Sequence, residues 1–306
     1  MDFVFYYYTP STAAAVIFTV LFGLSSLLHF YQLVRTRTWF MIPFLIGALL
    51  ETVGYIGRLL SSFEAPDFTK GPYIMQSALI LIAPAFLAAS IYMTLGRIIY
   101  MLEAEKLSII RIGWLTKIFV TGDVLSFLMQ ASGAGLMASS SDPSTGEHII
   151  IGGLFVQIIF FGLFTISAVV FHTRIIKTPT SRSIELKGPW TRHMTALYVA
   201  SVLILVRSVV RVAEYLEGYS GYLMKHEVFI YVFDALLIFI TVLVLQYEHP
   251  SEINCLIGRG HKYSEKAIWT REFVPDSSLS ALEMGRSGES QFEQLHESMG
   301  RGEVKR

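Results

Sequence analysis

Long apolar stretches, separated by short polar segments, dominate the chain between residues 13 and 250. A helix needs about 20 apolar residues to cross the hydrocarbon core of a bilayer, which is about 30 Å thick. Seven stretches reach that length, at residues 13–34, 40–60, 73–100, 114–137, 149–171, 194–216 and 228–247. The pattern therefore predicts an all-α membrane protein built as a bundle of seven transmembrane helices.

The two ends of the chain lie outside the seven apolar stretches. Residues 1–12 carry Asp2 as their only charged side chain, so the basic start of a cleaved signal peptide is missing. After His249-Pro250 the hydropathy falls, and residues 277–306 are rich in Ser, Gly and Glu, a composition that cannot bury a core. We expect a short extracytosolic segment at 1–12, a membrane domain at 13–250 and a cytosolic, largely disordered tail at 251–306.

Basic residues are unevenly shared between the two sets of alternating loops. One set carries only Lys70 and Lys225. The other set carries eleven, namely Arg35, Arg37, Arg97, Lys106, Arg111, Lys117, Arg174, Lys177, Arg182, Lys187 and Arg192. Because basic loops stay on the cytosolic side of a membrane, the amino terminus is predicted to lie outside and the carboxyl tail in the cytosol.

The overall charge of the chain bears on which kinds of partner it could bind. Lys plus Arg and Asp plus Glu both number 24, which gives no reason to expect a nucleic acid partner, and the mean hydropathy is +0.53. Membrane lipids are the expected surroundings. Cys255 is the only cysteine, so the chain cannot form an internal disulfide. We find no Gly-rich phosphate loop and expect no cofactor.

Charged side chains nevertheless lie within the predicted helices, where each costs about 2.5–3.5 kcal/mol at the bilayer centre. Their spacing places three residues on one face of the second, sixth and seventh helices. Because lipid offers no partner, these faces should turn inward around a polar cavity in the outer half of the bundle. The candidate substrate-binding or transport residues are Glu51, Tyr55, Arg58, Gln76, Asp123, Gln130, Gln157, Arg207, Arg211, Glu214, Glu227, Tyr231 and Asp234.

The arginines of the sixth helix require acidic neighbours. Arg207 and Arg211 repel each other four residues apart, and Glu214 can reach Arg211 along the same helix. Arg58 and Arg207 should then meet acids of other helices, namely Glu51, Asp123 or Asp234. One surplus carboxylate would remain and could exchange a proton during transport. Transport activity that is unchanged when the pH gradient is collapsed would contradict this hypothesis. Alternatively, buried ion pairs can simply lock helices in register.

Short motifs at these positions resemble a known family. They are Y-x-P-S at Tyr8, E-T-V-G-Y-I-G-R at 51–58, Q-x7-P-x-F-x-A-A-x-x-Y at 76–92, Asp123 with Q-A-S-G-A-G at 130–135, G-x-x-x-Q at 153–157, R-x-x-x-R-x-x-E at 207–214, E-x-x-x-Y-x-x-D at 227–234 and His249-Pro250. Together they resemble the fungal lipid-translocating exporter family, also called the RTA-like or aminocholesterol-resistance family. The resemblance covers residues 8–250, nearly all of the membrane domain.

This resemblance implies a protein that moves, or confers tolerance to, amphipathic lipids such as sphingoid long-chain bases or sterol-like amines. It implies a transporter of the plasma membrane or an endomembrane, and no enzyme. Glu51 and Glu227 would contact the cationic head group, while Arg207, Arg211, Glu214 and Asp234 would form a movable ion-pair scaffold. One departure is the stretch Thr12-Ala13-Ala14-Ala15, because family members often carry an Asn a few residues after Pro-Ser.

Other interpretations stay open. A receptor-like sensor of lipid or membrane stress would share the topology, but the seventh helix lacks N-P-x-x-Y; ligand-dependent coupling to a G protein would support it. A zinc hydrolase would need ligands that converge, and the candidates sit on several helices. These are His29, His172, His193 and His249. Tyr6, Tyr7 and Tyr8 are expected to form an interfacial aromatic belt.

Overall fold

A computed structural model describes residues 6, 8–139, 144–218 and 221–257 of the chain. Seven helices are long and apolar enough to cross a membrane, and the described residues contain no strand, so the predicted all-α bundle is confirmed. The first six are α1 (Thr12–Thr36), η1 and α2 (Trp39–Met41 and Ile42–Phe63), α3 (Lys70–Met101), α4 (Ile112–Ser139), α5 (Ser144–Lys177) and α7 (Lys187–Leu216). The expected disorder of the tail falls mainly on residues outside the described ranges.

The seventh span is not the single regular helix that the sequence predicts. It begins with α9 (Glu227–Ile230), continues through the π-helical turn η3 (Tyr231–Ala235) and ends with α10 (Leu236–Tyr247). A π turn accommodates one extra residue and re-aims the side chains on either side of it. Three short elements lie between spans, namely η2 (Glu105–Leu107), α6 (Ser181–Glu185) and α8 (Tyr222–Lys225), and α11 (Ser251–Leu256) follows the seventh span.

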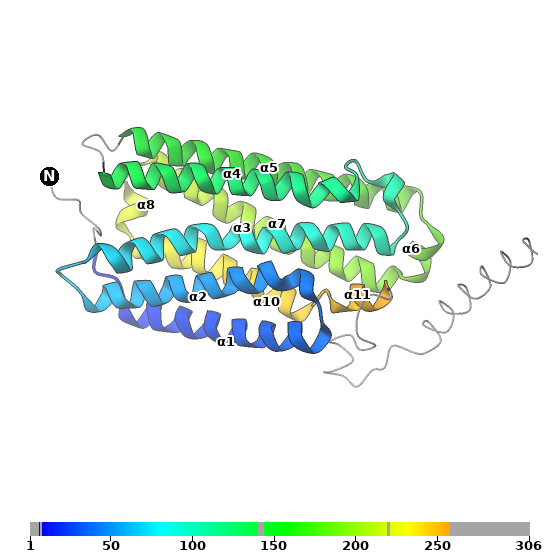
Figure 1. The fold of residues 1–306 in the computed structure, drawn as a ribbon, viewed down its shortest axis with the longest axis horizontal. Helices are drawn as coiled ribbons and strands as arrows, with labels where there is room; N and C mark the ends of the chain where they lie inside the picture. The colour runs from blue at the N-terminus through cyan, green and yellow to red at the C-terminus, as the bar shows by residue number, and fades with distance from the viewer. Residues whose placement is uncertain (1–5, 7, 140–143, 219–220, 258–306) are drawn as a thin grey trace, which may run out of the picture.

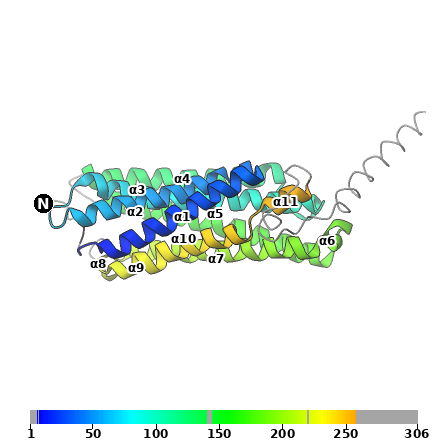
Figure 2. The same cartoon turned by 90° about the horizontal axis from the view of Figure 1, so that it is seen from below.

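The spans pack side by side as an elongated antiparallel bundle (Figure 1). α2 packs against α3 and α4 against α5, while α7 contacts α3, α5 and α10. α1 crosses obliquely beside α2 and α10 (Figure 2). Tyr6 and residues 8–11, here called the N-terminal segment, lie with α8 at one end of the bundle, here called the N-terminal end. α6 and α11 lie at the other end, here called the basic end (Figure 1).

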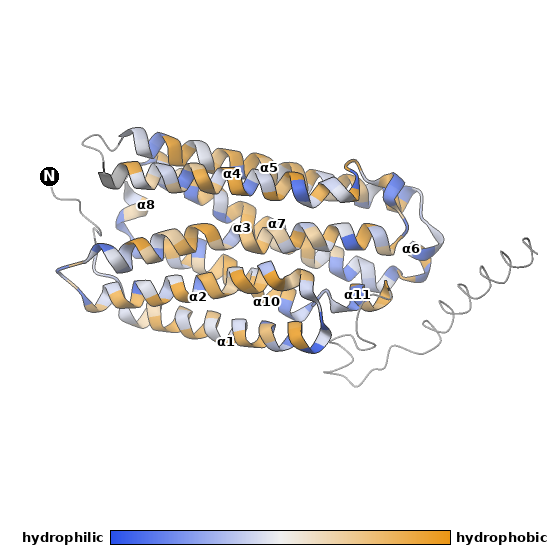
Figure 3. Cartoon of the chain, viewed as in Figure 1, coloured by the Kyte–Doolittle hydropathy of each residue, from blue (hydrophilic) through white to orange (hydrophobic). Residues whose placement is uncertain are grey.

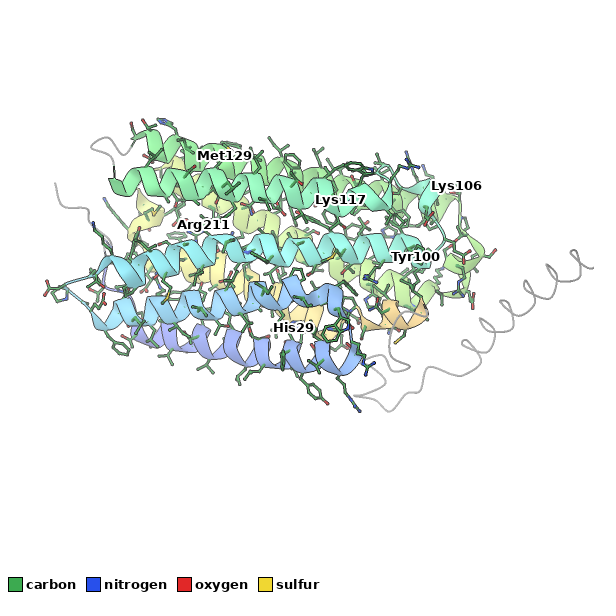
Figure 4. All side chains as sticks on the ribbon, in the orientation of Figure 1. His29, Tyr100, Lys106, Lys117, Met129 and Arg211 are labelled. Carbon is green, nitrogen blue, oxygen red and sulfur yellow. The ribbon has the colours of Figure 1, made fainter. Side chains whose placement is uncertain are left out.

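The alternating direction of the spans brings the loops that carry the eleven basic residues to one end of the bundle. Lys106 and Lys117 lie toward the basic end, whereas Arg211 lies toward the opposite one (Figure 4). Between the ends, hydrophobic residues predominate along the helices (Figure 3), and large apolar side chains such as Leu27 and Ile166 are exposed. Such a surface would be unfavourable in water and suits contact with lipid. Which end faces the cytosol stays a prediction.

Close packing of α4 and α5 depends on glycine. The hydroxyl of Ser126 donates a 2.7 Å hydrogen bond to the carbonyl oxygen of Gly153, so the two helix backbones lie close together. A Cβ at Gly153 would lie 2.8 Å from the carbonyl oxygen of Ser126, which cannot move aside easily because it belongs to the backbone. Small residues allow this approach in membrane helices.

We expect Gly153→Ala to lower the unfolding temperature of the purified protein in detergent, because overpacking costs about 1–3 kcal/mol. Gly162→Ala is the matched control on the same helix, since no atom lies within 4 Å of a Cβ at Gly162. The control should keep or raise the unfolding temperature, as alanine favours a helix. Equal behaviour of the two variants in a thermal unfolding experiment would contradict this account of the packing.

Candidate functional site

A buried carboxylate bridges two arginines in the half of the bundle nearer the N-terminal end. Asp234 lies in the π turn and is 3% exposed. Its Oδ1 accepts a hydrogen bond from Nε of Arg207, and its Oδ2 accepts one from Nη2 of Arg211 at 2.5 Å. Each oxygen therefore faces its own guanidinium group. This arrangement, here called the central cluster, joins α7 to the seventh span.

Arg207 also reaches α3. Its Nη2 donates a 2.9 Å hydrogen bond to the carbonyl oxygen of Ile80. In a regular α-helix that carbonyl would accept from the N–H of residue 84, but Pro84 has no N–H. A side-chain donor can satisfy a backbone group freed in this way. The guanidinium of Arg207 on α7 thus donates to two acceptors on other helices, the Ile80 carbonyl of α3 and the Asp234 carboxylate of the seventh span.

Arg211 extends the central cluster toward the surface. Its Nη1 donates to Oε2 of Glu214 at 3.0 Å, as the sequence spacing predicts, and its Nε has no hydrogen-bond partner among the described residues. Both side chains line a cavity of about 90 Å³, which has room for several water molecules. The cavity is bounded by the N-terminal segment, α3, α7, α8 and α9, and its other polar lining includes Tyr6, Tyr8, Tyr73, Gln76 and Ser77.

A third arginine, Arg58, belongs to a separate group, here called the terminal cluster. Nη2 of Arg58 donates to Oε1 of Glu227 at 2.7 Å and to the hydroxyl of Tyr8 at 3.0 Å. Nε of Arg58 donates to the hydroxyl of Tyr231 at 2.8 Å. The carboxylate of Glu227 also accepts the backbone N–H of Ser11, at 2.8 and 3.1 Å. This cluster therefore fastens the start of α1 to α2 and α9.

Glu51 and Tyr55 lie on the same face of α2 as Arg58. Glu51 is 1% exposed, and its Oε1 has no hydrogen-bond partner among the described residues. It interacts electrostatically with Asp234 and Arg207 of the central cluster. The ring of Tyr55 stacks on Phe22 at 5.5 Å between centroids, and its buried hydroxyl likewise lacks a described partner.

The remaining polar candidates lie apart from both clusters. Asp123 accepts a 2.9 Å hydrogen bond from the hydroxyl of Tyr92 and forms no ion pair with any residue the structure describes. Nε2 of Gln130 donates to Oε1 of Gln157 at 3.3 Å, which joins α4 to α5. The described residues therefore do not form a single polar network that includes Asp123 and Gln130.

Two expectations about charge pairing are wrong. Arg58 pairs with Glu227, not with Glu51, Asp123 or Asp234, because the start of α9 lies next to the C-terminal end of α2. Two deep carboxylates, not one, have no arginine partner among the described residues. They are Glu51 and Asp123, and they remain because Asp234 alone serves two arginines.

Direct head-group contact by Glu51 and Glu227 is not favoured by this geometry. Neither side chain lines the cavity, whereas Glu214 does. Glu227 is occupied by Arg58 and by the Ser11 N–H.

The tyrosines near the amino terminus do more than the expected aromatic belt. The hydroxyl of Tyr6 donates to Oε1 of Gln76 at 3.0 Å, and Tyr8 belongs to the terminal cluster. Tyr7 lies outside the described residues.

The four histidines considered as zinc ligands do not share one site. His29 bonds the carbonyl of Val242, and His172 bonds the hydroxyl of Tyr198 at 3.0 Å. His193 pairs with Glu252 at 3.1 Å, and the rings of His29 and His249 are 6.3 Å apart. The group of ligands required for the proposed hydrolase is therefore not formed by these residues together.

Sequence comparison adds independent information. Residues 44–255 match the family described as RTA1 like protein. Protein RTA1 of Saccharomyces cerevisiae is 36% identical over 94% of this chain and 98% of its own length. Protoporphyrin uptake protein 1 of the same species is 39% identical, over 79% and 90%. Sphingoid long-chain base transporter RSB1, also from Saccharomyces cerevisiae, is 28% identical, over 79% and 72%. No solved structure matches the chain.

We expect Asp234→Asn to cost about 3–5 kcal/mol of stability, because it leaves two buried guanidinium groups without their shared carboxylate. Asp123→Asn is the matched control, since both carboxyl groups are 3% exposed but Asp123 faces only the Tyr92 hydroxyl. An amide oxygen can still accept that bond, so the control should lose less than about 1 kcal/mol. Denaturant unfolding in detergent micelles measures both, and equal losses would refute the assignment.

Proposed function

Because the chain belongs to the RTA1-like protein family, we propose that it is a transporter of amphipathic lipids, with sphingoid long-chain bases or sterol-like amines as its substrate class. The observation that carries this proposal is the combination of a polar cavity and an ion-paired cluster inside a bundle whose outer surface is apolar. An amphiphile could place its head group in the cavity while its chain stays in lipid. An enzyme is not proposed, and the name of the long-chain base relative describes a transporter.

The cavity suits a cationic head group through Glu214. The carboxylate of Glu214 is 14% exposed and uses Oε2 to accept from Arg211, so Oε1 can accept from an ammonium group. Hydroxyl and amide groups of Tyr73, Ser77 and Gln76 surround the same space. They provide hydrogen-bond partners for the hydroxyl groups of a long-chain base.

Arg211 connects head-group binding to the helices. It holds Glu214 and Asp234 at once, so a cation that takes over Glu214 would leave Arg211 to Asp234. Glu51 lies within electrostatic reach of Arg207 and Arg211 and supplies an alternative acceptor. Exchange of partners between these groups is the movable scaffold that we propose for transport, in which differential binding shifts the population of two conformations.

A second candidate substrate follows from Protoporphyrin uptake protein 1, whose name states that it acts in uptake of a porphyrin. A porphyrin is a flat apolar molecule with carboxylate groups, and a carboxylate would pair with Arg211 instead of Glu214. The direction of transport would then be inward. The charge of the transported molecule distinguishes the two candidates. Removing the charge of Glu214 would weaken binding of a cationic long-chain base but not binding of a porphyrin carboxylate.

We also propose that the N-terminal end faces away from the cytosol, in the plasma membrane or an endomembrane. This orientation rests on the eleven basic residues of one set of loops. The cavity would then open on the extracytosolic side, where an exported lipid must be released.

In a Cys255→Ser background, a membrane-impermeant maleimide should label Lys225→Cys from the extracytosolic side of sealed vesicles of known sidedness. Lys187→Cys should be labelled only after permeabilisation, because Lys187 begins α7 at the opposite end of the bundle. Both lysines are exposed, which makes the two probes comparable. The reverse labelling pattern would overturn the orientation.

Proteoliposomes that contain the protein should move a labelled long-chain base across the bilayer faster than protein-free liposomes. Glu214→Gln should slow this movement by roughly tenfold or more, because hydrogen bonds to charged groups contribute about 1.5–3 kcal/mol. Glu217→Gln is the matched control, since Glu217 is exposed at the same end of α7 and lies outside the cavity lining.

A folded Glu214→Gln protein that transports the base at the wild-type rate would contradict the head-group assignment. Wild-type protein that moves neither the base nor a porphyrin faster than empty liposomes would contradict the proposed function. Transport of a porphyrin alone, insensitive to Glu214→Gln, would favour the second candidate.

A further inference from the structure

Three side chains that metal ions favour meet at the basic end of the bundle, far from the cavity. They are His193 on α7, Glu248 directly after α10 and Glu252 on α11. One ligand atom from each lies within 4.8 Å of the others, and Nε2 of His193 is 3.1 Å from Oε2 of Glu252. His193 is 2% exposed, whereas both glutamates are partly exposed. The group is thus buried on one side and accessible on the other.

The donor set suits a particular class of ion. One imidazole nitrogen and two carboxylate oxygens are ligands of Zn²⁺ and related first-row divalent ions, which accept water at a remaining position. Calcium and magnesium prefer oxygen ligands alone, so the imidazole argues against them. Ligand distances of about 2.0–2.2 Å around one ion require the atoms to approach by a small further rotation of the glutamate side chains.

The surroundings of Glu252 support a binding role. Nη2 of Arg192 donates to Oε1 and Oε2 of Glu252 at 3.1 and 3.3 Å. A carboxylate has about four acceptor positions, so Glu252 can keep this bond and still bind an ion. Metal-binding carboxylates are commonly oriented by such outer hydrogen bonds. Glu248 brings a second carboxylate to within 4.8 Å of the same ligand atoms.

We propose that His193, Glu248 and Glu252 form a binding site for a divalent transition-metal ion of the zinc class. Bound metal joins α11 and the end of α10 to α7 by coordination bonds at the basic end. It therefore stabilises the packing of these elements and leaves the cavity at the N-terminal end unoccupied. The site requires no catalysis, and it does not depend on the lipid-transport proposal.

Full-length protein, purified through a tag without histidine, tests the site by Co²⁺ titration followed by Zn²⁺ competition. We expect saturation at one Co²⁺ per chain, visible light absorption of a low-coordinate Co²⁺ complex, displacement by Zn²⁺ and a higher unfolding temperature with Zn²⁺. Glu248→Gln and His193→Ala should each weaken binding by about tenfold or more.

Two control variants separate this site from general surface binding. Glu185→Gln removes a 54% exposed carboxylate at the same end, and His226→Ala removes an exposed histidine at the other; both should bind as the wild type does. If His193→Ala fails to fold, the partly exposed Glu248→Gln decides the question. Absence of a saturable ion in the wild type, or wild-type affinity in folded Glu248→Gln, would overturn the proposal.

Discussion

Lipid cannot form hydrogen bonds to a charged side chain, and this constraint organises the half of the bundle nearer the N-terminal end. Arg58 and Arg207 are almost fully buried, so each must find its partners inside the protein. Arg58 uses Glu227 and the hydroxyls of Tyr8 and Tyr231, while Arg207 uses Asp234 and a backbone carbonyl. These contacts cross between helices far apart in the sequence. The charges thereby fix which helices are neighbours. Apolar contacts alone cannot do this, because an apolar helix face contacts lipid as favourably as it contacts another helix.

Two irregularities of the helices meet at Arg207. Pro84 removes the donor that the carbonyl of Ile80 would have in α3, and the π turn places Asp234 in the seventh span. Each irregularity alone would be costly within a membrane. The guanidinium group donates to both sites and so makes the two deviations compatible. A proline in one helix, an arginine in another and a carboxylate in a third therefore form one structural unit.

Hydropathy was sufficient to predict the spans, because a requirement of about 20 apolar residues is strict. The first predicted stretch, residues 13–34, lies within α1 (Thr12–Thr36). The pairing of Glu214 with Arg211 was equally accessible, since both lie on one helix. The partner of Arg58 was not, because it depends on how α9 is placed beside α2. Residue spacing gives the face of a helix but not its neighbour, which also explains why Asp123 was grouped with arginines that it does not contact.

The π turn and the role of Tyr8 had no clear signal in the sequence. A π turn depends on one extra residue within an otherwise helical pattern, and hydropathy does not resolve it. Tyr8 stands in a run of three tyrosines at the edge of the membrane domain. Aromatic residues are common there because their amphipathic rings favour the membrane–water interface. Its bond to Arg58 depends on where Tyr8 lies beside α2, which only the fold determines.

Stability alone does not account for the central cluster. Replacing a buried ion pair by apolar side chains of similar volume is often neutral or stabilising, so a bundle that needed only cohesion could do without these charges. Glu51 adds to the cost, because its Oε1 is buried without a described partner beside two arginines. The cluster also touches the cavity through Arg211 and Glu214 instead of being sealed from it. A set of charges with unused donors and acceptors next to an accessible space is poorly suited to a fixed brace. It is well suited to the exchange of ion-pair partners that we propose for transport.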